Sequence, residues 1–179
     1  MNQPSHNSQA GFTLVEMMVT SLIFSIIMIS VSGLFEQVLA NERRAFAAQA
    51  IQENGLFIME LMSREIRVST IENQESANCS ATTLTIDHPV NGTVTYSLSN
   101  GVLQRTAIEN GNPVTTDLTT STVSFSRLNF CITGSDPTDQ KQVRVAILAS
   151  IQNKTGKDIL TFNLETAVTS RNLESEFTR

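Results

Sequence analysis

The sequence is poor in aromatic and titratable residues. It has no tryptophan, one tyrosine (Tyr96), two histidines and two cysteines in 179 residues. With so few aromatic rings, no stacking surface for single-stranded nucleic acid is expected. The 17 Asp and Glu outnumber the 12 Lys and Arg, so the net charge is −5. A protein that binds nucleic acid would instead be expected to have a basic face. We therefore predict no nucleic-acid partner.

Groups that catalyse reactions or bind metals are also scarce. His88 is not accompanied by a Gly-x-Ser-x-Gly motif and is predicted to be a surface turn residue. The histidines and cysteines lack zinc-ligand spacing, and no glycine-rich phosphate loop is present. Asp136 and Asp139 could help to bind calcium, but two carboxylates without several further oxygen ligands favour a solvated turn there instead. We predict no catalytic residue, no metal ligand and no cofactor, and hence no enzyme.

The two cysteines, Cys79 and Cys131, are 52 positions apart. That distance excludes a CxxC redox or zinc motif. In an oxidising compartment they would form a disulfide. In the chain-entropy model, a disulfide that closes a loop of this length raises the free energy of unfolding by about 4 kcal/mol. The alternative is two separate buried thiols. We favour the disulfide because the membrane-seeking segment described next implies export.

Charged side chains are almost absent between residues 12 and 35, where Glu16 is the only ionisable side chain. As a helix this segment is about 36 Å long, enough to cross a hydrocarbon core of roughly 30 Å. It is longer than the apolar region of a secretory signal, about 7–15 residues. The segment is therefore predicted to be a membrane-spanning helix, with the lipid bilayer as its first partner.

The preceding residues, 1–11, contain no Lys or Arg and show no periodicity. They are interpreted as a targeting leader that does not belong to the fold. Because the first arginines are Arg43 and Arg44, beyond the apolar segment, the positive-inside rule gives no clear orientation.

Glu16 is costly in this setting, since an acidic residue deep in a membrane helix costs about 2.5–3.5 kcal/mol. One interpretation places it at the interface, in the first turn, where the helix dipole favours an anion. The other begins with the small-residue junction Gly11-Phe12. Cleavage there would give Phe12 a free ammonium, four residues before Glu16 on one helix face, able to pair with Glu16 of the same or a neighbouring subunit.

The run Gly11-Phe12-Thr-Leu-Val-Glu16, followed by an apolar helix, resembles the processing signature of type IV prepilins and type II secretion pseudopilins. The resemblance implies that prepilin peptidase cleaves between Gly11 and Phe12 and that Phe12 is N-methylated. It also implies that Glu16 guides docking during assembly. Other pilin or pseudopilin subunits and an inner-membrane assembly platform are the implied partners.

Residues 36–69 contain no proline and many good helix formers. Apolar residues at helical spacing fall on one side of this segment: Ala47, Ile51, Ile58, Leu61, Met62 and Ile66. Glu60 and Arg64 form an i,i+4 pair. The membrane helix is thus predicted to continue as an amphipathic helix, whose apolar stripe packs on a domain. Gly55 is expected to mark a bend or a close approach of another backbone.

Beyond a predicted loop at 70–81, β-branched and aromatic residues dominate. The predicted strands are 82–86, 93–98, 102–106, 122–132, 142–151 and 159–170. Asn100-Gly101 predicts a tight hairpin, as does Asn91-Gly92. The imperfect alternation near Arg127 predicts a bulge.

A long helix followed by strands predicts an α+β fold, with the amphipathic half-helix on one face of an antiparallel sheet. The predicted organisation is a leader at 1–11, a transmembrane and assembly helix at 12–35 and a globular domain at 36–179. The Tyr96–Arg105 hairpin and residues 168–172 resemble minor pilins of the PilW type and J-type pseudopilins.

We therefore expect a structural minor pilin or pseudopilin in a tip or initiation complex. It would span the inner membrane once before assembly, with its domain in the periplasm or outside the cell, and then join a pilus or pseudopilus. The alternative is a membrane-tethered binding module or enzyme that does not polymerise.

Overall fold

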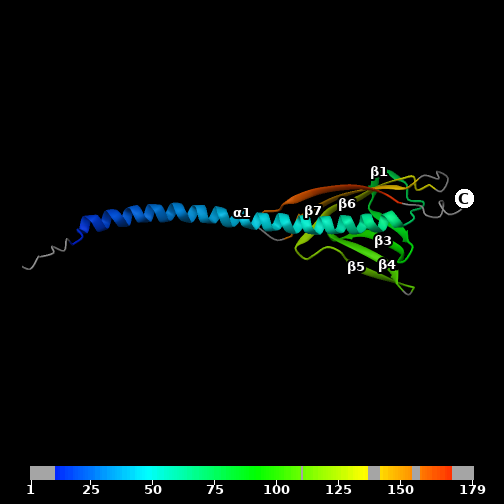
Figure 1. The fold of residues 1–179 in the computed structure, drawn as a ribbon, viewed down its shortest axis with the longest axis horizontal. Helices are drawn as coiled ribbons and strands as arrows, with labels where there is room; N and C mark the ends of the chain where they lie inside the picture. Colours follow the sequence, from blue (N-terminus) through cyan, green and yellow to red (C-terminus); the bar gives the residue numbers. More distant parts are fainter. Residues whose placement is uncertain (1–10, 110, 137–141, 155–157, 171–179) are drawn as a thin grey trace, which may run out of the picture. The chain divides into compact units, whose positions relative to one another are not determined.

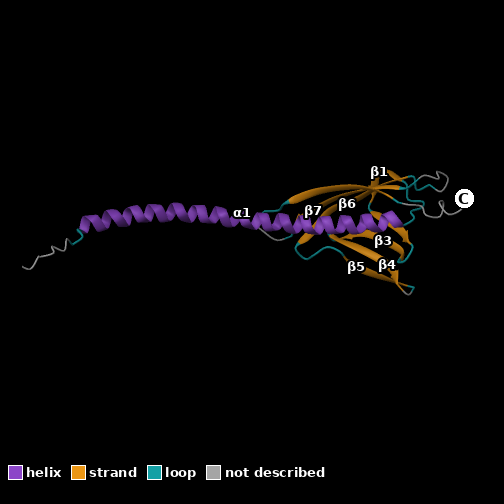
Figure 2. Ribbon diagram, in the orientation of Figure 1, coloured by secondary structure: helices purple, strands orange, loops and turns teal. Residues whose placement is uncertain are grey.

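The computed structural model describes residues 11–109, 111–136, 142–154 and 158–170. The chain divides into two compact units, Met1–Arg43 and Arg44–Arg179. One continuous helix, α1, runs from Leu14 to Val68 and contributes to both units (Figure 2). The helix begins two residues later than predicted.

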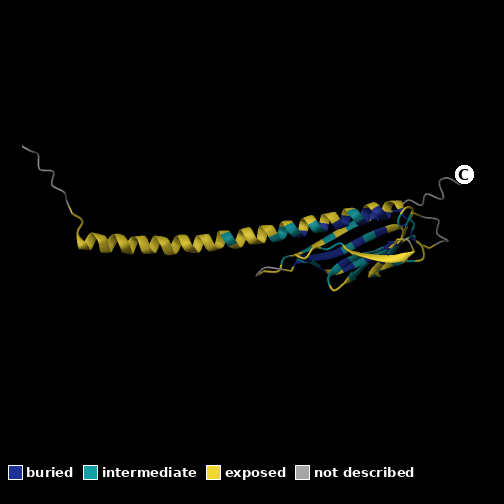
Figure 3. Ribbon diagram, turned by 90° about the horizontal axis from the view of Figure 1, so that it is seen from below, coloured by how far each residue is buried: buried dark blue, intermediate teal, exposed yellow. Residues whose placement is uncertain are grey.

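Within the second unit, α1 is amphipathic, as predicted. Ile51, Ile58, Met62 and Ile66 of the predicted stripe are buried. The charged residues Glu53, Glu60 and Arg64 are exposed, and the Glu60–Arg64 ion pair is present at 3.9 Å. Figure 3 shows the buried residues concentrated toward the end of the helix that packs on the strands.

Among the residues that the structure describes, eight strands follow the helix and form two four-stranded antiparallel sheets. The first sheet has the order β2-β3-β4-β5 and the second the order β1-β6-β7-β8 (Figure 1). In chain order the strands are β1 (Ser76–Ala81), β2 (Thr83–His88), β3 (Gly92–Ser99), β4 (Val102–Glu109), β5 (Asn112–Asp117), β6 (Val123–Thr133), β7 (Arg144–Asn153) and β8 (Thr161–Thr169). The α+β class and all six predicted strands are confirmed, but the strands divide between two sheets where we expected one.

The predicted loop at 70–81 was wrong at its C-terminal end, where Ser76–Ala81 form β1. This strand pairs irregularly with β6, and Cys79 has a positive φ of 59°. Ser, Ala and Asn are weak strand formers and show no alternation, which is why the sequence reads as a loop. Strand β5 was not predicted, because all six of its residues are exposed and so leave no apolar pattern.

The predicted turns and the bulge are confirmed. Asn100 and Gly101, with φ of 49° and 77°, join β3 to β4, the left-handed geometry of a tight hairpin. Gly92, with φ of 64°, ends the turn between β2 and β3. The β6–β7 register shifts between Phe125 and Arg127. This bulge allows Phe125, Leu128 and Phe130 all to face the core.

The core lies between α1 and the two sheets. Gly55 of α1 faces β8, where an added Cβ would lie 2.6 Å from Leu164 Cδ1. The prediction of a close approach at Gly55 is therefore confirmed, but the neighbour is a side chain rather than a backbone. On the other sheet, Glu65 of α1 bonds to Tyr96 of β3 and Arg105 of β4. The helix thus joins the two sheets.

Candidate functional site

The N-terminus of α1 is capped by Thr13. The Glu16 N–H donates to Thr13 Oγ1 at 3.2 Å, and the Met17 N–H donates to the Thr13 carbonyl at 3.2 Å. Thr13 is therefore the N-cap and Glu16 the third helical residue, the spacing of a capping box. This role was not predicted from the sequence, although Thr-x-x-Glu before an apolar run is its recognised signature.

From Leu14 to Val38 the helix exposes its apolar side chains on all sides. Phe24 is 58% exposed, Ile29 is 74% exposed, and every residue of α1 before Leu39 is exposed. The helix contains an 18-residue window that is long and apolar enough to cross a membrane, and none of that window is buried (Figure 3). The first unit thus presents an apolar surface that nothing in the described chain covers.

The polar side chains of this segment bond within the helix. Each hydroxyl donates to a carbonyl three or four residues earlier in the chain, as seen for Thr20, Ser21, Ser25, Ser30 and Ser32. Side chains satisfied in this way can enter hydrocarbon without unpaired hydrogen-bonding groups. The hydroxyls are therefore compatible with a lipid-facing helix.

Glu16 is different, because its exposed carboxylate makes no ion pair or hydrogen bond within the described residues. Phe12 is 78% exposed and precedes the helix. In the unprocessed chain Thr13 caps the helix between the two residues, so Phe12 lies outside it. The expectation that they share a helix face concerns the cleaved chain and stays a prediction. Gly11 is also exposed, as a cleavage site requires.

Comparison with protein families finds the prokaryotic N-terminal methylation motif at residues 6–32. A search of curated proteins found no match, and a search of solved structures found none either. The motif covers the Gly11-Phe12 junction, Glu16 and most of the apolar helix.

The structure thus combines a methylation motif at the start of an exposed apolar helix with two antiparallel sheets. The chain fits a type IV pilin-like protein. The motif implies processing by prepilin peptidase and assembly with other pilins. It is also consistent with membrane anchoring.

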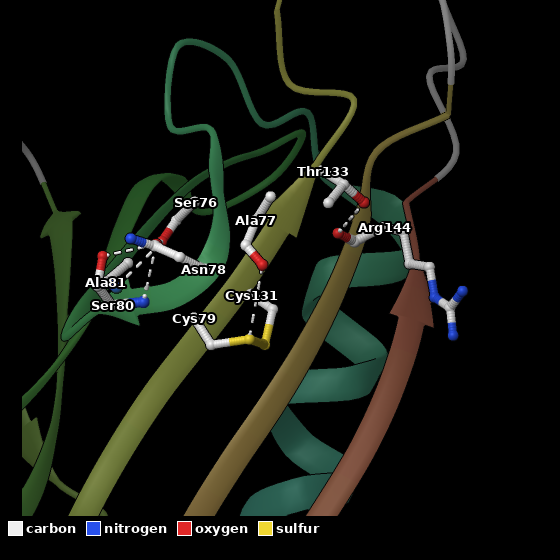
Figure 4. The surroundings of a disulfide bond; sticks show 9 residues. All are labelled: Ser76, Ala77, Asn78, Cys79, Ser80, Ala81, Cys131, Thr133 and Arg144. Atoms are coloured by element: carbon white, nitrogen blue, oxygen red, sulfur yellow. Dashed lines mark hydrogen bonds between the residues drawn. A yellow bond between two sulfur atoms is a disulfide. The ribbon is translucent and has the colours of Figure 1, made fainter.

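Cys79 and Cys131 form a disulfide that joins β1 to β6 (Figure 4). Asn78 supports the bend in β1, since its Oδ1 accepts from the Ser80 N–H at 3.3 Å and from the Ser80 hydroxyl at 2.8 Å. The backbone register joins β1 to β6 at only two residue pairs, and the disulfide adds a covalent link between the same strands. The disulfide therefore has a structural role.

A buried charged cluster, which was not predicted from the sequence, fixes the last turn of α1. Glu65 accepts hydrogen bonds from Arg105 Nη2 to Oε1 at 2.9 Å and from Arg105 Nε to both carboxylate oxygens at 3.2 Å. It accepts another from the Tyr96 hydroxyl. Tyr96 and Arg105 are direct cross-strand partners in β3 and β4. Glu65 lies three residues after Met62 and seven after Ile58, which places it on the buried stripe of α1. An acidic residue at such a position indicates a buried partner, and this was the one sign of the cluster in the sequence.

Each member of the cluster is held in its ordinary protonation state. Burial alone would raise the pKa of Glu65, but the Arg105 and Tyr96 hydrogen bonds and the Arg105 charge outweigh it and lower that pKa. Burial, together with the hydrogen bond to Glu65, raises the pKa of Tyr96 well above its usual range. Burial would lower the pKa of Arg105, but Glu65 raises it. At neutral pH the cluster is therefore an ion pair, suited to docking a helix rather than to proton transfer.

Two further positions were singled out in the sequence, His88 and the Asp136–Asp139 segment. His88 organises a turn, as predicted, because its Nδ1 accepts from the N–H groups of Val90 and Asn91 at 3.1 Å each. Asp139 lies outside the described residues. Within the described residues, no group of three or more His, Cys, Asp or Glu can hold a metal ion.

An open pocket of about 370 Å³ lies beside Arg105, lined by Val90, Asn91, Arg105, Ala107, Ile108 and Glu109. Because Arg105 is already bound to Glu65, this pocket offers no uncompensated positive charge for a ligand.

Proposed function

We propose that this protein is a structural, non-catalytic subunit of a type IV pilus or related pseudopilus. Prepilin peptidase would cleave it between Gly11 and Phe12, and Phe12 would be N-methylated. The observation that carries the proposal is the methylation motif at 6–32 on a helix whose apolar residues are exposed. The proposed leader, Met1–Gly11, lies outside the described residues except for Gly11.

The apolar half of α1 has two successive environments in this proposal. Before assembly it spans the inner membrane, with the second unit in the periplasm or outside the cell. During assembly it is extracted and buried among the helices of other subunits, which favours the fibre by about 25 cal/mol per Å² of apolar surface removed from water. The assembly platform performs the extraction.

Glu16 sets the register between subunits in this mechanism. Its carboxylate has no partner in the described chain, and an ion left unpaired in an apolar contact is costly. The ammonium that cleavage creates at Phe12 of a neighbouring subunit supplies the partner. Only a correctly staggered neighbour places that cation beside Glu16.

We further propose a minor, tip-initiating subunit rather than the main building block. The supporting feature is the hairpin from Tyr96 to Arg105, which resembles PilW-type minor pilins and J-type pseudopilins, and which contains the Tyr96–Arg105 pair that binds α1. The shared hairpin points to either system, a type IV pilus or type II secretion.

The first test is the mass of the mature N-terminus in native cells. A chain that begins with methylated Phe12 supports the proposal. An intact Met1, or cleavage elsewhere, supports the alternative of a tethered binding module or enzyme that uses α1 only as an anchor.

The second test separates the two roles of Glu16. Glu16→Gln keeps the length and hydrogen-bonding capacity of a capping box but removes the charge. Glu16→Ala removes both, and Glu36→Gln is the matched control, an exposed acid farther along the same helix. We expect normal membrane insertion for all three, with fibre incorporation lost for both Glu16 variants and retained for Glu36→Gln. Normal incorporation of Glu16→Gln would reject pairing by charge.

A further inference from the structure

The two sheets have four edge strands, and an open edge can pair with a strand of another chain. The outer edge of β2 is already largely hydrogen-bonded by other residues of the chain. The Gln74 side chain donates to the Thr85 carbonyl at 2.5 Å and accepts from the Thr85 N–H at 2.8 Å. Thr70 makes both backbone bonds with Asp87, at 3.0 and 2.9 Å. The chain therefore covers the edge of β2 with its own polar groups.

Strand β5 is blocked by proline. Leu118 N–H donates to Leu103 O at 2.8 Å, and bonded pairs alternate along an antiparallel ladder. In the β4–β5 register, Val114 and Thr116 therefore face β4 and Pro113 faces outward. Pro113 has no N–H to offer a partner, and β5 has only six residues.

The edge of β1 is irregular. Its register with β6 shifts between Ser76 and Ala81, and Cys79 has positive φ. A bent, bulged strand is a poor template for another strand.

Strand β8 has none of these protections. Its nine residues, Thr161–Thr169, pair with β7 in one uninterrupted register. The strand contains no proline or glycine, and its only charged residue is Glu165. Within the described residues, no strand or side chain forms hydrogen bonds with the backbone groups of β8 on the edge that faces away from β7.

The bonding pattern identifies which residues face this open edge. Ser170 N–H donates to Val143 O at 2.8 Å, and Asn153 N–H donates to Leu160 O at 3.3 Å. Both pairs continue the β7–β8 register, so the even-numbered residues of β8 bond to β7. The N–H and C=O groups of the odd-numbered residues therefore point outward, from Thr161, Asn163, Glu165, Ala167 and Thr169. All five residues are exposed.

Charge distinguishes between possible occupants of the edge. Within the described residues, none of the four edge strands contains Lys or Arg, and β2, β5 and β8 carry Asp87, Asp117 and Glu165. A second copy that paired through one of these described edge strands would therefore place a neutral or acidic strand beside Glu165. Glu165 makes no ion pair within the described residues. Opposite charges facing each other across strands are stabilising, and like charges are not.

We propose that the open edge of β8 binds an extended strand of a different protein chain, with a Lys or Arg placed opposite Glu165. Backbone bonds to the five outward-facing residues would supply affinity, and the Glu165 pair would set the register. This interface lies wholly in the second unit and does not depend on whether the chain polymerises.

The test uses the full-length chain in detergent micelles and two labelled nine-residue peptides. Both peptides alternate Thr and Val, and the central residue is Lys in one and Glu in the other. We expect the Lys peptide to bind about two- to fivefold more tightly, the range of a cross-strand charge pair. It should also slow hydrogen exchange at the odd-numbered amides of β8. For Glu165→Lys, the preference between the two peptides should reverse.

Ala167→Pro removes one outward N–H without touching a bond to β7, and Ala167→Ser is its matched control. We expect the proline variant to weaken both peptides and the serine variant to bind like wild type. Equal binding of both peptides to wild type, or exchange protection elsewhere in the chain, would overturn the proposal. So would a dimer of the wild-type chain alone that Ala167→Pro abolishes, since the occupant would then be a second copy.

Discussion

Replacing Glu65 with leucine would remove the anion from a buried cluster and leave its partners in place. The side chains of Glu65 and Arg105 are only 10% and 16% exposed. In Glu65→Leu the Arg105 guanidinium loses a bidentate partner, and the Tyr96 hydroxyl, on a residue that is fully buried, loses its acceptor. Breaking a buried pair by removing one partner costs about 3–5 kcal/mol. Because Arg105 keeps some contact with solvent, we expect the lower end, about 3 kcal/mol.

The size of this effect can be read from thermal unfolding. For a domain of this size, about 3 kcal/mol lowers the Tm by roughly 6–12 °C. Tyr96 is the only tyrosine and tryptophan is absent, so its near-UV circular dichroism reports on this cluster when the full chain is melted in micelles. The matched control is the double variant Glu65→Leu, Arg105→Met, which removes both charges and should recover most of the loss. A Glu65→Leu variant that melts within about 2 °C of wild type would refute the reasoning.

The same cluster predicts a dependence on pH. Because the pKa of Glu65 is lowered in the folded state, its ionised form stabilises the fold above the ordinary glutamate pKa of about 4.3. That stabilisation is lost as pH falls through the lower, folded-state pKa. The difference in Tm between wild type and Glu65→Leu should therefore be full at neutral pH and shrink in acid. A difference that grows on acidification would have the wrong sign.

Three further predictions concern the second unit. Reducing the Cys79–Cys131 disulfide, or the variant Cys79→Ser with Cys131→Ser, should lower the free energy of unfolding by about 2–5 kcal/mol in denaturant titration; no change would show that β1 holds without it. Gly55→Ala should destabilise by about 1–3 kcal/mol through overpacking against Leu164, and adding Leu164→Ala should make the two effects non-additive; simple additivity would refute the contact. Alkaline titration followed by tyrosinate absorbance should show Tyr96 ionising only when the chain unfolds, whereas ionisation near pH 10 in the folded chain would contradict its burial.

The sequence predicted the elements that bury a regular apolar pattern. The period of Ile51, Ile58, Met62 and Ile66 predicts α1, and alternation predicts β6 and β8, because burial on one face imposes those periods. Strands β1 and β5 bury almost nothing and leave no such signal. The division into two sheets was also missed, since alternation shows which face of a strand is buried but not which strand lies beside it.

For the candidate site, the sequence identified Gly11, Phe12 and Glu16, because a short motif marks them. It missed Thr13 as the helix cap and the Glu65 cluster. The partners of Glu65 are 31 and 40 residues away in the chain, and no local pattern indicates such a contact. Long-range pairing of charges is a property of the fold rather than of any one segment.

Glu16 and Glu65 are two acids on apolar stretches of one helix, and the fold treats them in opposite ways. Around Glu65 it supplies a guanidinium and a hydroxyl, so the buried charge is matched within the chain. Around Glu16 it supplies only the Thr13 cap, which binds the backbone N–H and leaves the carboxylate unpaired within the described residues. A carboxylate that enters lipid or a helix bundle needs a cation or a proton. Since the described chain provides no cation near Glu16, we expect that cation to come from processing or from a neighbouring subunit.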